Sequence, residues 1–155
     1  MTAFLYKAMG CLVFIMLAAT AYAAPWDKSQ QLKKMTDAYD TSKSEAFEGT
    51  VEQFFEITPP KSPSLGVHMI VKAEAESVDI HLGPAWYITR SDNQIAIGDS
   101  KIYKGDLVKV VGAKFEGPLN PKYKLRGIRA AEVWKKGIMV FELRDKNGKP
   151  LWSGY

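Results

Sequence analysis

Cysteine and histidine are scarce in this 155-residue chain, which has one cysteine and two histidines. Cys11 lies in an apolar N-terminal segment that we expect to be removed. The remaining chain then has no disulfide, no thiol nucleophile and no Cys-x-x-Cys-His haem motif. Its stability must come from a hydrophobic core, for which 46% hydrophobic and 12% aromatic residues provide the material.

The apolar run at residues 11–19 is shorter than the roughly 20 residues that a membrane-spanning helix needs. It leads into Ala21-Tyr22-Ala23, the small-x-small pattern of a signal-peptidase site. We therefore expect residues 1–23 to be a cleaved signal peptide, and the mature protein to be periplasmic with no transmembrane segment. A retained membrane anchor is the alternative. Residues 24–46 are predicted to form a short helix and a connector before a β-barrel domain at 47–155.

Enzyme motifs are missing as well. The chain contains no Gly-x-Ser-x-Gly, no His-Glu-x-x-His, no P-loop and no Gly-x-Gly-x-x-Gly. We therefore predict a protein that is not an enzyme, with no resident cofactor other than the transition metal discussed below.

The period-two alternation of residues 67–73 and 78–82 predicts a β-hairpin. Pairing Val71 with Ile80 would place Met69 opposite Leu82 and Lys72 opposite Asp79. One face would then be apolar, with Val67, Met69, Val71, Val78, Ile80 and Leu82. The other face would carry His68, Ile70, Lys72, Asp79 and His81.

Further strands are predicted at residues 47–57, 107–113, 125–134 and 138–144. The third of these needs a bulge at Ala130-Ala131 to keep its apolar residues on one side. A long strand, a hairpin, a crossover and two more strands is the order of an OB-fold. We therefore predict a mainly β protein, a small OB-fold-like barrel of five to six strands. A different small barrel or an open meander is the alternative. The expected core includes Val71, Ile80, Val108 and Val110.

Several short motifs resemble a family of small exported bacterial proteins with an OB-fold-like domain, the domain of the magnetosome proteins MamS and MamX. The most specific piece is His81-Leu-Gly-Pro-Ala-Trp-Tyr87. The others are Gly49-Thr-Val-Glu52, Gly66-Val-His68, Gly105-Asp106, Ala130-Ala-Glu-Val133 and Pro150-Leu-Trp-Ser-Gly154. Relatives of the MamX kind carry haem through Cys-x-x-Cys-His, which this chain lacks, so a haem role does not transfer.

His68 and His81 are the candidate metal ligands. The predicted register makes them diagonal neighbours, roughly 7–8 Å apart between Cα atoms. Two imidazoles at that spacing can share a transition metal, with Asp79 or a water completing the site. The alternative is that each histidine only fixes the barrel mouth through hydrogen bonds.

Two other groups are candidate ligand-binding residues. Trp86 and Tyr87 follow Gly83-Pro84 and are predicted to form an aromatic platform, unless Trp86 plugs the barrel end. A second group, in the basic C-terminal half of the chain, consists of Arg126, Arg129, Lys135 and Lys136. Residues 91–155 hold 13 lysines and arginines against 7 acidic residues, whereas residues 24–90 hold 7 against 10. A solvated basic face is the alternative for this group.

These observations predict an exported binding or accessory module for an anionic ligand or an envelope protein partner. A metal-handling periplasmic protein (iron, copper or zinc) is one alternative. A nucleic-acid-binding protein is another, although export makes nucleic acid an improbable natural partner.

Overall fold

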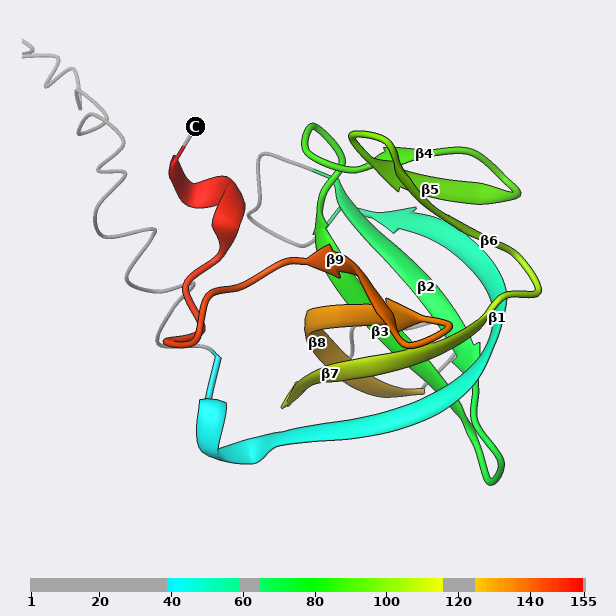
Figure 1. The fold of residues 1–155 in the computed structure, drawn as a ribbon, viewed down its shortest axis with the longest axis horizontal. Helices are drawn as coiled ribbons and strands as arrows, with labels where there is room; N and C mark the ends of the chain where they lie inside the picture. The colour runs from blue at the N-terminus through cyan, green and yellow to red at the C-terminus, as the bar shows by residue number, and fades with distance from the viewer. Residues whose placement is uncertain (1–38, 59–64, 116–124, 155) are drawn as a thin grey trace, which may run out of the picture.

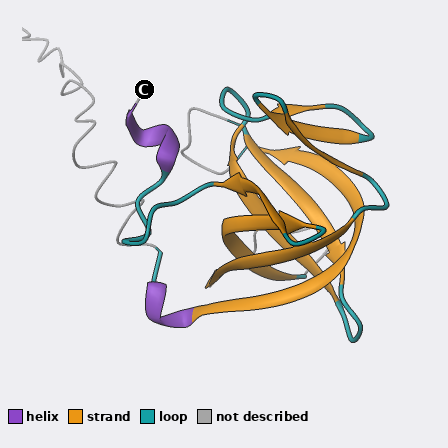
Figure 2. Ribbon diagram, viewed as in Figure 1, coloured by secondary structure: helices purple, strands orange, loops and turns teal. Residues whose placement is uncertain are grey.

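The computed structural model describes residues 39–58, 65–115 and 125–154. The predicted signal peptide and most of the predicted N-terminal helix lie outside these residues. Figures 1 and 2 show an architecture dominated by strands. The strands are β1 (Ser44–Ile57), β2 (Gly66–Lys72), β3 (Ser77–Pro84), β4 (Thr89–Arg90), β5 (Gln94–Ile97), β6 (Ser100–Tyr103), β7 (Leu107–Phe115), β8 (Arg126–Lys135) and β9 (Ile138–Glu142), with 3-10 helices η1 (Thr41–Lys43) and η2 (Leu151–Gly154). None of the helices in the described part of the chain has the length and apolar character needed to cross a membrane.

Five strands close into a ring. The sheet runs in the order β3-β2-β1-β7-β8-β9, and β3 also pairs with β8, in parallel. The remaining contacts of the ring are antiparallel, and β9 extends the sheet beyond β8. The prediction of a small, mainly β barrel is confirmed. The first strand begins at Ser44, three residues before the predicted start.

The hairpin of β2 and β3 has a different register from the predicted one. Val71 pairs with Val78 rather than Ile80, and His68 pairs directly with His81 rather than lying diagonal to it. The cause is a tighter turn, closed by a 2.9 Å hydrogen bond from Ala73 N to Glu76 O. From His68 to Lys72 the register error is two residues, so these side chains keep their predicted faces. The register shifts between Val67 and His68, and Val67 and Leu82 are both buried as predicted.

One core fills the ring. All six side chains of the predicted apolar face of the hairpin are fully buried, and so are Val108 and Val110. The predicted bulge on β8 is present, because Val111 pairs with Glu132 while Gly112 pairs with Ala130 and Ala131 is left over. That extra residue lets Ile128, Ala130 and Val133 all reach the core.

A second sheet of β4, β5 and β6 was not predicted from the sequence. It occupies one end of the molecule (top right in Figure 1). Its strands are two to four residues long, too short for a clear period-two pattern. Residues 85–87 form a turn after β3, and the chain then enters β4.

The C-terminal segment closes another part of the barrel. Trp152 in η2 is buried, and its ring atoms lie so close to Gly83 that a Cβ there would meet Cζ3 at 2.9 Å. Trp86 is 58% exposed and does not plug the barrel end. Trp152 therefore takes the packing role that the sequence offered as one interpretation of Trp86.

Candidate functional site

The histidine pair lies on the outer face of the β2–β3 hairpin. His68 and His81 are direct cross-strand partners, and their ring centroids are 4.9 Å apart in an edge-to-face arrangement. The prediction that they share a face is confirmed. They are closer than predicted, because direct partners in an antiparallel pair lie nearer than diagonal ones.

Asp79 fixes one ring of the pair. His68 Nδ1 lies 2.8 Å from Asp79 Oδ1, and both side chains are almost completely buried. Phe55 on β1 stacks against the same imidazole at 5.2 Å between centroids. A carboxylate on Nδ1 orients the ring and leaves Nε2 as the nitrogen that can bind a metal, the arrangement common to metal-bound histidines.

Gly66 provides the space into which both histidines point. A Cβ on Gly66 would lie 3.2 Å from His81 Nε2 and 3.4 Å from His68 Nε2. The two Nε2 atoms therefore flank a single point above the backbone of β2. A Cβ at residue 66 would make a tight contact with both rings and would occupy the position that the two Nε2 atoms flank.

His81 is held in its neutral form. Burial lowers its pKa well below 6.5, and electrostatic interactions with His68, Arg129 and Arg144 add to the effect. A neutral imidazole keeps a lone pair for a metal. In residues 39–58, 65–115 and 125–154, no group of three or more His, Cys, Asp or Glu is placed around a single metal position. Water or a bound ligand would fill the remaining coordination positions.

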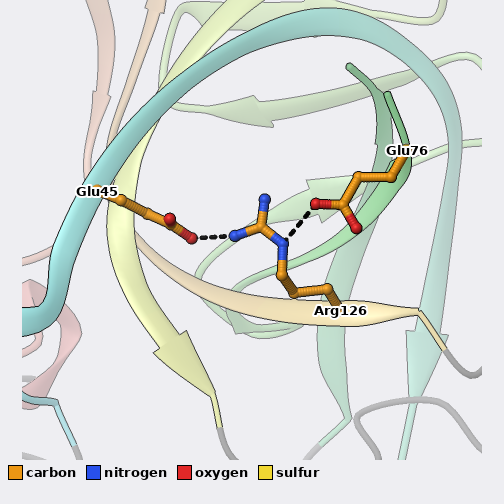
Figure 3. A network of polar contacts seen from close by, with 3 residues as sticks. All are labelled: Glu45, Glu76 and Arg126. Atoms are coloured by element: carbon orange, nitrogen blue, oxygen red, sulfur yellow. Dashed lines mark hydrogen bonds and ion pairs between the residues drawn. The ribbon is translucent and has the colours of Figure 1, made fainter. Parts of the chain in front are cut away.

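Arg126, at the start of β8, is engaged within the protein. It forms ion pairs with Glu45 of β1 and Glu76 of the β2–β3 turn, and Figure 3 shows the guanidinium between the two carboxylates. It also lies over the Phe47 ring at 5.7 Å. These contacts join the turn of the hairpin to β1 and β8. Arg126 therefore has a structural role in addition to the ligand-binding role that was predicted for it.

Lys135 is also paired. Its Nζ lies 2.6 Å from Asp106 Oδ2 and 5.4 Å from the centre of the Tyr103 ring. Lys136 follows it in an exposed turn. Arg126 and Lys135 stand at opposite ends of the ten-residue β8, which at ~3.3 Å per residue separates them by about 30 Å. The predicted basic residues therefore do not form a single patch.

Arg129 lies on the outer face, as the parallel pairing partner of His81. It is half-buried, and burial lowers its pKa. Trp86 and Tyr87 contact each other edge to face, and Tyr87 also contacts Trp152. Of the six predicted ligand-binding residues, Arg129 lies next to the histidine pair, and Tyr87 connects through Trp152 to the C-terminal segment.

The Lys135–Asp106 pair leads to a pH-dependent prediction. Partial burial alone would raise the pKa of Asp106, but hydrogen bonds from Lys135 and from Tyr103 N outweigh it and lower that pKa below 3.8. A carboxyl with a lowered folded-state pKa stabilises the protein above about 3.8 and loses that contribution as pH falls through the lowered value. Asp106→Asn should therefore cost about 1 kcal/mol at pH 7.

Urea unfolding at pH 7 and below pH 3 measures this effect. The stability difference between wild type and Asp106→Asn should shrink at the acid end. Asp99→Asn, a change at an exposed carboxylate, should make no difference at either pH. A stability difference for Asp106→Asn that is the same at both pH values would contradict the assignment.

Sequence reasoning missed two features: the position of Gly66 between the two Nε2 atoms, and the burial of Arg144. The predicted strand at residues 138–144 ends at Arg144, and the predicted hairpin begins one residue after Gly66. The sequence feature that could have indicated the burial of Arg144 is its position directly before the turn Asp145-Lys-Asn-Gly148. In the structure, Arg144 Nη1 donates to the turn carbonyl Gly148 O at 2.8 Å.

The fold and this site define a small, mainly β barrel protein with a carboxylate-oriented histidine pair on its outer face. The profile of the MamS/MamX magnetosome protein family matches residues 43–137, more than half of the chain. The chain therefore belongs to that family, and the resemblance seen in its motifs is confirmed. Comparison with curated proteins found no match.

Proposed function

We propose that this protein is an exported, non-enzymatic binding or accessory module of the bacterial envelope, built on an OB-fold, and that it handles a transition-metal ion through His68 and His81. The observation that carries the proposal is the convergence of the two Nε2 atoms at Gly66. The strand order supports the OB-fold assignment, because β1, β2, β3, β7 and β8 form a five-stranded barrel in Greek-key order, closed by the parallel β3–β8 pairing.

The histidine pair suits a transition-metal ion of intermediate softness. Imidazole nitrogen binds Zn²⁺, Cu²⁺ and iron, with Zn–N distances near 2.0–2.1 Å. His68 has the carboxylate partner that metal-bound histidines use, and His81 is neutral. Two protein ligands leave coordination positions open, which suits a protein that accepts and passes on a metal rather than one that buries it.

Membership of a magnetosome protein family supports a metal-handling role in the envelope. The sequence supports export through its N-terminal segment. Because the haem motif is missing, the histidine pair is the part of this chain that would contact the metal directly.

Calorimetric titration with Zn²⁺ and Cu²⁺, on protein purified without a histidine tag, tests this function. Wild type should bind one ion, and His68→Ala and His81→Ala should each weaken binding by about 100-fold or more. Asp79→Asn should weaken it by roughly 10–100-fold, because Asp79 acts on His68 rather than on the ion.

Lys101→Gln, a change on the exposed side of β6, is the matched control and should bind like wild type. Circular dichroism should show that all variants remain folded. If wild type binds no ion, or if the histidine variants bind as well as wild type, the metal function is wrong.

A further inference from the structure

The outer face of β7, β8 and β9 carries exposed apolar side chains. These three strands are neighbours in the six-stranded sheet, and β9 forms its edge (Figure 1). Leu107 is 64% exposed, Ile138 is 70% exposed and Met139 is 40% exposed. Met139 is the direct cross-strand partner of Trp134, so these two side chains share the face. Exposed apolar side chains that gather on one surface are typical of an association site.

A hollow of about 440 Å³ lies beside Trp134 on this face. It is lined by Leu107 and Lys109 of β7, by Trp134 and Lys136, and by Glu48 of β1. The register agrees with this arrangement, because Lys109 pairs with Trp134 and with Glu48. The hollow therefore brings residues from three strands to one place, and it has room for a side chain from another molecule.

The charges on this face change sign along the direction of β8. Glu132, Trp134 and Lys136 follow one another at intervals of two residues, the spacing of side chains on one face of a strand. On β9, Glu142 is the direct partner of Glu132, as Met139 is of Trp134. One end of the face is therefore acidic, its centre is apolar and its other end is basic.

The acidic end is unfavourable in a single copy of the chain. Glu132 and Glu142 are directly opposite each other, and like charges in that position repel. Within residues 39–58, 65–115 and 125–154, no ion pair joins either carboxylate to a lysine or arginine. Lys136 forms no ion pair in those residues either, although its charge acts on Asp106. A cation from another molecule would relieve the repulsion at the acidic end.

We propose that a second copy of this chain binds this face, with its strands antiparallel to those of the first. A two-fold axis in the plane of the interface places the acidic end of each copy against the basic end of the other, and the two apolar centres meet. Lys136 of each copy then faces Glu142 of the partner subunit. An occupant of one charge sign, such as an anionic membrane surface or a nucleic acid, would be attracted to one end and repelled by the other.

The proposed dimer face is separate from the histidine pair. Arg129 is the parallel pairing partner of His81, and it precedes Trp134 by five residues on β8. At ~3.3 Å per residue, this places the centre of the face about 16 Å along the strand from the histidines. The dimer proposal therefore does not depend on metal binding.

Sedimentation velocity between about 1 and 500 μM, with a metal chelator present, tests the dimer on protein as the exporting cell processes it. Wild type should show a reversible monomer–dimer equilibrium. Lys136→Glu and Glu142→Lys should each weaken association about tenfold or more, because each places like charges at two symmetric contacts. Lys114→Glu makes the same charge change at an exposed position near the other end of β7, and it should associate as wild type does.

The double variant Lys136→Glu/Glu142→Lys tests the antiparallel arrangement. It restores both contacts with their signs exchanged, so it should recover most of the association that the single variants lose. Circular dichroism should show that every variant is folded. All variants share one N-terminal segment, so association through that segment would not respond to the charge reversals.

A wild type that stays monomeric at every concentration, or a Lys136→Glu variant that associates as wild type does, would leave this face to a different occupant. The dimer would then be wrong. A double variant that associates no better than the single variants would exclude the antiparallel pairing of Lys136 with Glu142, and the proposal would fail on that result as well.

Discussion

Replacing Gly112 with alanine is expected to lower the free energy of unfolding by about 3 kcal/mol. Gly112 lies on β7 opposite the bulge of β8, where the two strands approach closely. A Cβ there would be 2.3 Å from Arg129 O and 2.7 Å from Ile128 Cγ2. The first of these atoms is backbone, so no rotamer change relieves the clash. The ring must open locally or the bulge must move.

Urea unfolding of Gly112→Ala and of Lys114→Ala, an exposed site on the same strand, measures this effect. The lysine variant should stay within about 0.5 kcal/mol of wild type. Gly49→Ala, whose Cβ would meet Lys72 O at 2.4 Å across the β1–β2 contact, should behave like Gly112→Ala. A loss below about 1 kcal/mol for both glycine variants would mean that the strands are not held as closely as described.

Gly66→Ala is expected to abolish metal binding while both histidines remain in place. The new methyl group would lie 3.2–3.4 Å from the two Nε2 atoms, in the space where the ion must sit. Metal affinity should fall by at least about 100-fold, since the ion can no longer contact both rings. Gly66 has no left-handed backbone conformation, so alanine brings no backbone strain there.

Calorimetry with Zn²⁺ measures this loss, and urea unfolding measures the accompanying change in stability, which should be smaller than that of Gly112→Ala. Ser91→Ala, at an exposed position outside the hairpin, is the control. Wild-type affinity in Gly66→Ala would show that the ion does not lie between the two Nε2 atoms. Any loss of metal affinity in His68→Ala and His81→Ala would then need a different explanation.

The barrel could be predicted because its strands are long and half-buried. Alternation of apolar and polar residues from Val67 to Leu82 identifies the inner face whatever the register, and a two-residue error leaves that face unchanged. The bulge at Ala131 was also predictable, since Ile128, Ala130 and Val133 can reach one core only if the strand gains a residue. The small sheet of β4–β6 gave no such signal.

The candidate site was only half predictable. The alternation of apolar and polar residues places His68 and His81 on one face. The distance between them depends on the length of the turn that Ala73 and Glu76 close, and the sequence pattern does not indicate that length. The role of Gly66 depends on where two rings meet, and that of Arg144 on a C-terminal segment that returns to the barrel. Contacts between residues distant in the chain need the folded structure.

X-ray absorption spectroscopy at the zinc edge, on protein loaded with one equivalent of Zn²⁺, tests the central claim most directly. The account predicts a first shell with two imidazole nitrogens near 2.0–2.1 Å and the outer-shell scattering of imidazole rings, completed by oxygen atoms. Both imidazole contributions should disappear from the spectrum of Gly66→Ala. A shell of oxygen atoms alone in the wild type, without imidazole scattering, would contradict the account.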